Sequence, residues 1–446
     1  PEQHDLNQFI IQIAEEYDMK IVSTGDSHYP NPDAWKDREL YKRLGWLGRG
    51  KPEWLDMNLP TSVQEMEYEL YPKNGQEMWE SYKQYSEECE QDYSDELIRQ
   101  SIEESYHIAM ERCEDFIPDT TVRLPEFVVP AGYNEDEYLD RVSSEGLFTI
   151  LKNRGLTRKQ GKSSSPIYKY EKRLKHELKV IADRGFSKYF LTMKAIADKT
   201  NEIQISGPGR GSAAGSLVAY ALGITQVDPI KYDLLFSRFL RSDATDYPDI
   251  DYDVSDPMVL KDVMIEQWGS STVVPISNWN TLQLRSLIKD ISKFYEIPFI
   301  EVNAVTGKMM HEATPAAKKK HGIRAGVYTP TFDEVIEFSE SLQKFFKKYP
   351  HVKEHVKALH GSYRSCSRHA GGVVIGEGLD RYMPLISSKG VRQTPWSEGM
   401  NVRQLEPMGF IKFDILGLST LRMIEDCVSK ILRRHHGVEN PTFAQI

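Results

Sequence analysis

Pro248-Asp249-Ile250-Asp251-Tyr252-Asp253 is the stretch of sequence on which the predicted fold depends. Acidic and apolar residues alternate in it, and a period of two is the repeat of a β-strand. A strand over 247–254 would place the three carboxylates on one face, about 7 Å apart along the strand. An exposed acidic edge strand would show the same alternation, so the interpretation depends on the neighbouring segments.

The three carboxylates on this face point to divalent cations. Like charges this close repel one another unless cations lie between them. Ligands that are all oxygen favour Mg²⁺ or Mn²⁺. Two such ions roughly 3.5–4 Å apart assist phosphoryl transfer, because they activate an attacking hydroxyl and stabilise the leaving oxygen.

A glycine-rich loop lies upstream, between a strand predicted over 202–205 and a helix predicted over 217–222. It reads Gly207-Pro208-Gly209-Arg210-Gly211-Ser212-Ala213-Ala214-Gly215-Ser216. Glycines bring backbone N–H groups close to an anion, and the start of a helix favours phosphate. Arg210 and Ser212 add side-chain donors. The spacing matches neither a Walker A loop nor the dinucleotide fingerprint, and a tight strand–helix turn with an exposed arginine is the alternative.

Two further strands are predicted downstream, over 372–375 and 410–413, after a largely helical stretch over 257–365. Lys412 and Asp414 share one face of the last strand, and an acid between apolar neighbours is costly unless it is a ligand or is paired. A structural lysine–aspartate pair is therefore the alternative to a metal ligand. The glycines after His369 suit the close approach of a backbone or a ligand, and we assign His369 no catalytic role.

Composition limits the function classes. The 446 residues carry a net charge of -10, with 40% hydrophobic and 27% charged residues, which predicts a soluble globular protein of about three domains. Neither a signal peptide nor an apolar run of about 18 residues is present, so no membrane association is expected. The four cysteines are far apart, which is typical of a reduced, cytoplasmic protein.

Local charge differs from the average. Residues 152–188 hold twelve Lys or Arg against three acids, and more lysines lie over 318–357. Basic stretches of this kind favour contact with a phosphate backbone, although a solvated amphipathic helix would look similar. Helices are also predicted over 8–16 and, rich in acids, over 76–115. A short buried strand predicted over 20–24 ends at Gly25-Asp26-Ser27-His28, as at the end of an α/β layer.

Together these motifs resemble the catalytic core of the bacterial-type C-family replicative DNA polymerases, the alpha subunits of DNA polymerase III. The stretches GPGRGS, LLFSRFL (234–240), PDID, HAGGVVI and KFDILGL occur in the family's order. The resemblance implies a mixed α/β fold with a polymerase-beta-like nucleotidyltransferase palm, acting on primer–template DNA and deoxynucleoside triphosphates. It implies two Mg²⁺ ions, with Mn²⁺ possible, and catalytic metal ligands at Asp249, Asp251 and Asp414.

The same resemblance assigns other residues. It implies nucleotide binding by Arg210, Gly211, Ser212, Arg238 and Lys412, and a supporting role for Asp253. Asp26 and His28 resemble late metal ligands of a polymerase-and-histidinol-phosphatase domain, whose earlier ligand motifs the sequence does not contain, so no metal is expected at this pair. The implied domains are the end of that domain with connecting helices (1–118), the palm (119–256 and 366–425), a helical thumb insertion (257–365) and the start of the fingers (426–446).

The chain also departs from the family pattern. Ala244 stands where an arginine is usual, with Arg241 as a substitute, and Ser277-Asn278-Trp279-Asn280-Thr281 replaces the typical Thr-Phe-Gly-Thr stretch. We expect the chain to be part of a larger polymerase, completed by a complementing C-terminal segment and other replisome subunits. The alternatives are a palm fragment that binds DNA or a partner without extending primers, and a phosphoesterase activity of the first domain.

Overall fold

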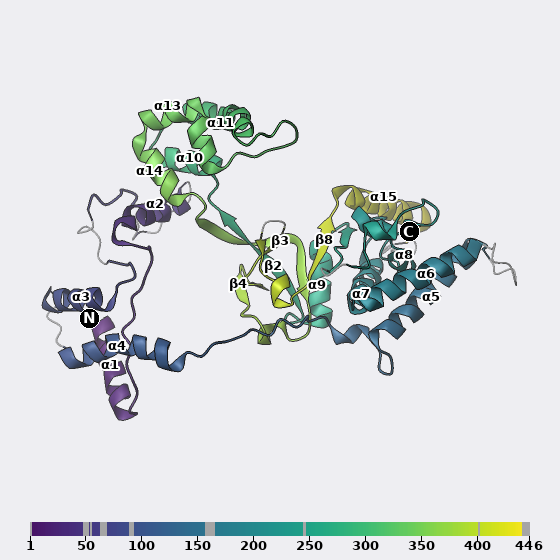
Figure 1. Ribbon diagram of the computed structural model, residues 1–446, viewed down its shortest axis with the longest axis horizontal. Helices are drawn as coiled ribbons and strands as arrows, with labels where there is room; N and C mark the ends of the chain where they lie inside the picture. The colour runs from purple at the N-terminus through teal and green to yellow at the C-terminus, as the bar shows by residue number, and fades with distance from the viewer. Residues whose placement is uncertain are drawn as a thin grey trace. The chain divides into compact units, whose positions relative to one another are not determined.

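The computed structural model describes residues 2–47, 53, 56–62, 69–88, 93–156, 166–243, 247–399 and 402–438. The chain forms two compact units, each built from two stretches of sequence (Figure 1). The first unit comprises Pro1–Ile117 and Thr281–Arg364, and the second comprises Pro118–Asn280 and Ser365–Ile446. Cys89, Ala244 and residues 157–165 of the basic segment lie outside the described residues.

A four-stranded sheet organises the second unit. Its strands are β1 (Asp251–Val254), β8 (Lys412–Gly417), β3 (Tyr363–Ile375) and β2 (Val273–Thr281), in the order β1-β8-β3-β2. β1 runs parallel to β8, and β3 runs antiparallel to it. This register places Asp251 and Gly372 on either side of Asp414, so segments far apart in sequence meet at the centre of the sheet.

One face of the sheet is apolar and buried against helices. Ile250, Tyr252, Phe413 and Ile415 belong to the core of the second unit. The ring of Tyr189 stacks on Phe413 with 5.2 Å between ring centroids. The helices of this unit are α5 (Glu135–Asn153), α6 (Pro166–Asp183), α7 (Ser187–Ile203), α8 (Leu217–Ala221), α9 (Pro257–Trp268) and α15 (Ser419–His436). Burial of this face leaves the acidic face available for chemistry.

The first unit is helical. Its helices are α1 (Glu2–Glu16), α2 (Trp35–Trp46), α3 (Gly75–Glu88), α4 (Asp95–His107), α10 (Leu284–Phe294), α11 (Phe299–Lys320), α12 (Phe332–Phe338), α13 (Glu340–Lys348) and α14 (Pro350–Leu359). Leu40 of α2 shares one apolar core with helices α10 to α14, through residues such as Leu287, Phe345 and Val356. Segments about 240 residues or more apart in sequence are therefore held together by burial of apolar surface.

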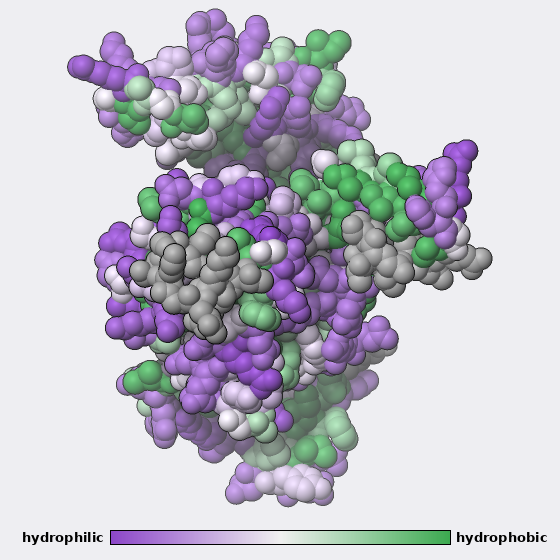
Figure 2. Space-filling model, turned by 90° about the vertical axis from the view of Figure 1, so that its right-hand side faces the viewer, coloured by the Kyte–Doolittle hydropathy of each residue, from purple (hydrophilic) through white to green (hydrophobic). Residues whose placement is uncertain are grey.

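The remaining elements are short. They are the hairpins β4 (Ile386–Ser388) with β5 (Val391–Gln393) and β6 (Glu398–Gly399) with β7 (Val402–Arg403), the 3₁₀ helices Pro32–Ala34, Glu126–Val128, Gly211–Gly215, Phe236–Arg238, Leu379–Arg381 and Glu406–Met408, and the π-helix Ile108–Arg112. α15 leaves the large apolar side chains of Met423, Ile424 and Ile431 exposed. Hydrophobic surface is visible on the face drawn in Figure 2. None of the described helices is long and apolar enough to cross a membrane.

The mixed α/β class is confirmed, whereas several element boundaries are wrong. Residues 20–24 form no strand, and the described part of the first unit offers no strand beside them. Residues 202–203 end α7, and only Ser206 forms a single bridge with Val254. The strand predicted over 247–254 is regular only from Asp251. The stretch 257–365 is largely helical, as predicted, but β2 lies within it and pairs in the sheet of the second unit.

Candidate metal centre

Three carboxylates converge on the acidic face of the sheet. Asp249 precedes β1, Asp251 begins it, and Asp414 lies opposite Asp251 on the neighbouring strand β8. One ligand atom from each residue lies within 4.8 Å of the other two. The period-two pattern brings Asp249 and Asp251 to this face, and the parallel pairing of β1 with β8 adds Asp414.

The electrostatics of this cluster favour a bound cation. Burial, together with the charges of Asp251 and Asp414, raises the pKa of Asp249 above its ordinary value. Burial and the charge of Asp414 also raise the pKa of Asp251. Three carboxylates with this mutual repulsion are stabilised by positive charge placed among them.

Asp414 provides a more specific test of whether a metal fits. Its Oδ2 atom forms an ion pair with Lys412 Nζ at 2.8 Å, so the lysine and the acid that share a face contact each other. Its Oδ1 atom is buried and has no hydrogen-bond partner among the described residues. Buried polar atoms nearly always have a partner. The orphaned oxygen and the all-carboxylate donor set therefore fit a hard divalent cation such as Mg²⁺ or Mn²⁺.

The mutual repulsion of these carboxylates should lower the stability of the metal-free fold, although the same carboxylates would bind the metal. The folded-state pKa of Asp249 is raised, so the stability of the metal-free fold falls as pH rises through that pKa. Asp249→Asn removes the repelling charge and should raise the melting temperature by a few degrees at neutral pH without metal. Mg²⁺ should then raise the melting temperature of the wild type more than that of the variant, as measured by thermal denaturation.

Asp243→Asn is the matched control for this prediction. Asp243 is an exposed carboxylate whose pKa is lowered by its ion pair with Arg241, 2.6 Å away. Exposed pairs contribute little, so this variant should shift the melting temperature by about 1 °C or less. A lower melting temperature for Asp249→Asn than for the wild type would show that the carboxylates do not destabilise the fold.

The glycine loop lies directly against the acidic strand. Gly207 N donates to Asp253 O at 2.8 Å, and Arg210 Nη1 donates to Asp253 Oδ1 at 3.2 Å. A methyl group on Gly211 would lie 3.8 Å from Asp251 Oδ2, and Gly211 has a φ of +63° that favours glycine. Ser212 is exposed in the 3₁₀ helix that follows. The loop therefore presents Arg210 and Ser212 beside the carboxylates.

The start of α8 does not serve an outside anion. Glu177 Oε2 accepts hydrogen bonds from Leu217 N at 2.7 Å and Val218 N at 3.1 Å. The prediction that phosphate uses this helix start is therefore wrong, because a buried carboxylate of the chain already occupies it. In the sequence, Glu177 is only one of three acids in a basic segment, and no sequence pattern indicates this contact.

A cavity of about 510 Å³ opens beside the metal centre. It is lined by Asp249, Lys412 and Asp414 and also by Arg403 and Glu398. Arg403 Nη2 forms an ion pair with Glu406 Oε2 at 2.7 Å, which places a guanidinium at this cavity. No sequence motif surrounds Glu398, Arg403 and Glu406, so only the structure indicates that they line the cavity.

The other predicted residues are exposed side chains, some of which form local ion pairs. Arg238 is exposed in its 3₁₀ helix. Arg241 is paired with Asp243 on the surface. His28 Nε2 lies 2.9 Å from Asp26 Oδ2, and among the described residues no third acid, histidine or cysteine completes a metal-binding group with them.

His369 holds the backbone of β3. Its Nδ1 atom accepts hydrogen bonds from Gly371 N at 3.2 Å and Gly372 N at 2.6 Å. The fully buried Lys261 donates to Ala370 O at 2.8 Å, and burial lowers the pKa of this lysine to about 8. These contacts shape the strand next to Asp414.

Similarity to known proteins supports a common origin for this arrangement. A family described as "Bacterial DNA polymerase III alpha NTPase domain" matches residues 137–417, a range that contains the glycine loop and all three carboxylates. Three curated proteins named DNA polymerase III subunit alpha are also similar. The protein of Aquifex aeolicus is 30% identical over 98% of this chain and 37% of its own length.

The other two relatives give the same result. The protein of Borreliella burgdorferi is 31% identical over 96% of this chain and 34% of its own length. The protein of Bacillus subtilis is 30% identical over 96% of this chain and 34% of its own length. The chain therefore spans about a third of the length of these relatives.

Proposed function

Because the chain belongs to the bacterial DNA polymerase III alpha family, we propose that it carries the catalytic centre of a template-directed DNA polymerase. The reaction would join a deoxynucleoside triphosphate to the 3′-hydroxyl of a primer. The observation that supports this most strongly is the convergence of Asp249, Asp251 and Asp414 within 4.8 Å, beside a glycine loop. Primer–template DNA and the four deoxynucleoside triphosphates would be the substrates.

The architecture suits this activity. The sheet and helices of the second unit would form a palm of the polymerase-beta-like nucleotidyltransferase type. Helices α10 to α14, which lie within the stretch 257–365, would form the thumb. Residues 1–118 would be the end of a polymerase-and-histidinol-phosphatase domain with connecting helices, and 426–446 the start of the fingers. A complementing C-terminal segment and other replisome subunits would be the protein partners.

The carboxylates would hold two Mg²⁺ ions. Asp249, Asp251 and Asp414 would bind one, and Asp249 and Asp251 would also bind the second. When bound, the ions would favour ionisation of the attacking hydroxyl and stabilise the leaving pyrophosphate. Bound ions would favour the charged forms of Asp249 and Asp251, whose pKa values are raised in the metal-free site by burial and by the neighbouring carboxylates.

Basic side chains would orient the triphosphate. Arg210 offers a planar fork of donors, and Asp253 holds one of its nitrogens at 3.2 Å. Lys412, 2.8 Å from Asp414, provides a positive charge at the cavity next to the carboxylates. Gly211 lets the loop backbone approach Asp251, and Ser212 and Arg238 supply further exposed donors. These groups would bring the α-phosphate into line with the primer hydroxyl.

Primer extension tests the proposal directly. The chain would be mixed with primed template, Mg²⁺ and all four deoxynucleoside triphosphates, and the product lengths measured. Template-dependent extension supports a polymerase centre within this chain. Primer–template binding without extension would instead favour a palm that requires a complementing segment, and the absence of both would contradict the DNA-directed function.

The outer face of α6 would contact duplex DNA. Lys169, Lys172, Lys175 and Lys179 are exposed on it, whereas Arg173 faces the protein interior. Each phosphate neutralised by a lysine contributes about 0.9 to the slope of log affinity against log salt concentration. The triple variant Lys172→Ala/Lys175→Ala/Lys179→Ala should therefore weaken binding and make this slope shallower by about 2–3.

Lys199→Ala is the control for this measurement. Lys199 lies on α7 of the same unit and forms a local ion pair with Glu202 at 2.7 Å. Its replacement removes one positive charge but should leave the salt dependence of primer–template binding unchanged. An unchanged slope for the triple variant, measured by fluorescence anisotropy between 50 and 200 mM salt (roughly the range in which the effect is large), would remove α6 from the DNA interface.

A further inference from the structure

Glu177 is a fully buried carboxylate that joins α6 to the glycine loop. Besides Leu217 N and Val218 N, its Oε2 atom accepts a hydrogen bond from Ser216 Oγ at 3.0 Å. Ser216 is the last residue of the loop and caps α8 through Ala219 N at 3.1 Å. The position at which the loop ends is therefore set by one side chain of α6.

Arg173 provides a second connection from the same helix. Its Nε atom donates to Glu177 Oε1 at 2.6 Å. Its Nη2 atom donates to Gly215 O at 2.9 Å and to Leu234 O at 3.1 Å. One guanidinium thus links the end of the glycine loop to the start of the 234–240 segment, which carries Arg238.

These two segments lie in direct contact. A methyl group on Gly215 would lie 2.8 Å from Leu235 O, so only glycine allows the two backbones to approach this closely. Both segments are short 3₁₀ helices and loops, and within 206–216 only Ser206 forms a bridge to a strand. Side-chain contacts must therefore supply the rigidity that sheet pairing does not.

We propose that Arg173 and Glu177 are positioning residues that hold the glycine loop and the 234–240 segment in the arrangement required to bind the triphosphate of the incoming nucleotide. This inference rests on the proposed function, because it assumes that Arg210, Ser212 and Arg238 contact that triphosphate. Arg173 and Glu177 do not themselves touch the nucleotide. They act through Gly215, Ser216 and Leu234, whose main-chain or hydroxyl groups they hold.

The test compares Glu177→Gln with the wild-type chain in two binding measurements. Glutamine keeps the size of the side chain but replaces one acceptor oxygen by an amide and removes the charge that pairs with Arg173. The dissociation constant for deoxyadenosine triphosphate with Mg²⁺ should rise roughly ten- to a hundredfold, which is the loss expected when one charge-assisted hydrogen bond to the triphosphate is no longer made. The dissociation constant for primer–template DNA should stay within about twofold.

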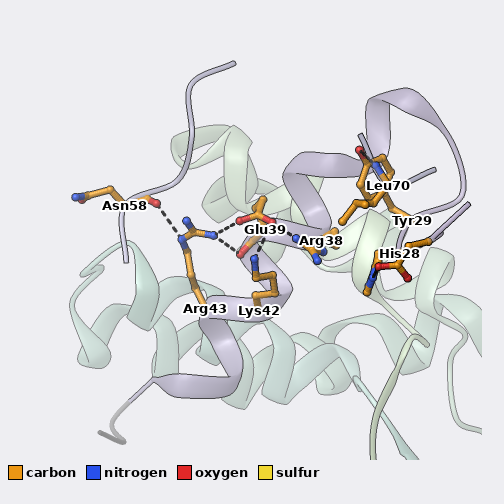
Figure 3. Close-up of polar contacts among 9 residues, drawn as sticks. His28, Tyr29, Arg38, Glu39, Lys42, Arg43, Asn58 and Leu70 are labelled. Carbon is orange, nitrogen blue, oxygen red and sulfur yellow. Dashed lines mark hydrogen bonds and ion pairs between the residues drawn. The ribbon is translucent and has the colours of Figure 1, made fainter. Parts of the chain in front are cut away.

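Glu39→Gln is the matched control for a merely structural effect. Glu39 is also a buried carboxylate on a helix, paired with Arg43 at 2.6 Å, and it receives further contacts from Arg38 and Lys42 (Figure 3). Glu39 belongs to the first unit, whereas the three carboxylates belong to the second. Glu39→Gln should lower the melting temperature while leaving both dissociation constants unchanged.

A second variant covers the case in which Glu177→Gln does not fold. Arg173→Lys retains the positive charge but cannot donate to Glu177 Oε1, Gly215 O and Leu234 O together. It should also weaken nucleotide binding selectively. Nucleotide affinity that is unchanged in the folded variants, or equally weakened in Glu39→Gln, would overturn the inference. A wild-type chain that binds no nucleotide would overturn the proposed function together with it.

Discussion

Asp251→Asn should lower the rate of primer extension by roughly a thousandfold or more, equivalent to about 4 kcal/mol of transition-state stabilisation. Asp251 is proposed to bind both ions, and its carboxylate lies within 4.8 Å of those of Asp249 and Asp414. Asparagine keeps the shape of the side chain but removes the charge on which ion binding depends. Single-turnover extension of a labelled primer with saturating nucleotide measures the loss.

Binding of primer–template DNA should survive this substitution. The variant removes a negative charge, so the affinity for the DNA backbone should stay the same or rise slightly. Asp262→Asn serves as control, because Asp262 is an exposed carboxylate on α9 of the same unit and should extend primers at the wild-type rate. Extension by Asp251→Asn at a rate close to the wild type would contradict the assignment of the metal centre.

Gly371→Ala should lower the extension rate by about a hundredfold, although Gly371 touches no substrate in the proposed mechanism. A methyl group there would lie 2.7 Å from Leu416 Cδ2 and 3.0 Å from Ile415 O, both on β8. Strand β8 also carries Lys412 and Asp414, so relief of the overlap should displace the carboxylate of Asp414, a proposed metal ligand. Displacements of about 1 Å cause rate losses of this size, and overpacking should cost about 1–3 kcal/mol of stability.

Gly307→Ala is the control for this prediction. Gly307 is an exposed residue within α11, and a methyl group there would meet nothing within 4 Å. Alanine is favoured over glycine inside a helix by about 1 kcal/mol, so this variant should be slightly more stable and fully active. Pre-steady-state extension and denaturant unfolding of both variants measure the two effects. A fully active Gly371→Ala would show that β8 adjusts without moving Asp414.

Stability and activity are opposed at this centre. Asp249→Asn should raise the melting temperature of the metal-free protein, and loss of a proposed metal ligand should also lower its activity. Loss of the buried pair of Arg173 and Glu177 should instead lower the melting temperature, because the start of α8 is left without a matched acceptor. Measurement of both melting temperature and nucleotide affinity therefore separates residues that bind cations from residues that support the fold.

The sequence by itself determined the local features whose cause is local. The alternation around Asp249 and Asp251 predicted one acidic and one apolar face, because side chains in a strand point to alternate sides. The shared face of Lys412 and Asp414 followed from the same rule and is confirmed by their 2.8 Å contact. Strand ends were predicted poorly, since the pairing of neighbouring strands determines them.

Only the tertiary structure decided which contacts form between segments that are distant in sequence. The pairing of β1 with β8 brings Asp414 to Asp251 across more than 160 residues, an arrangement that the sequence reached only through family resemblance. In the sequence Glu177 is one acid in a basic segment, whereas in the fold its buried carboxylate accepts hydrogen bonds from the first N–H groups of α8, where the sequence predicts phosphate. The physical reason is that burial and strand register depend on the whole packed chain, whereas side-chain periodicity depends only on the local backbone.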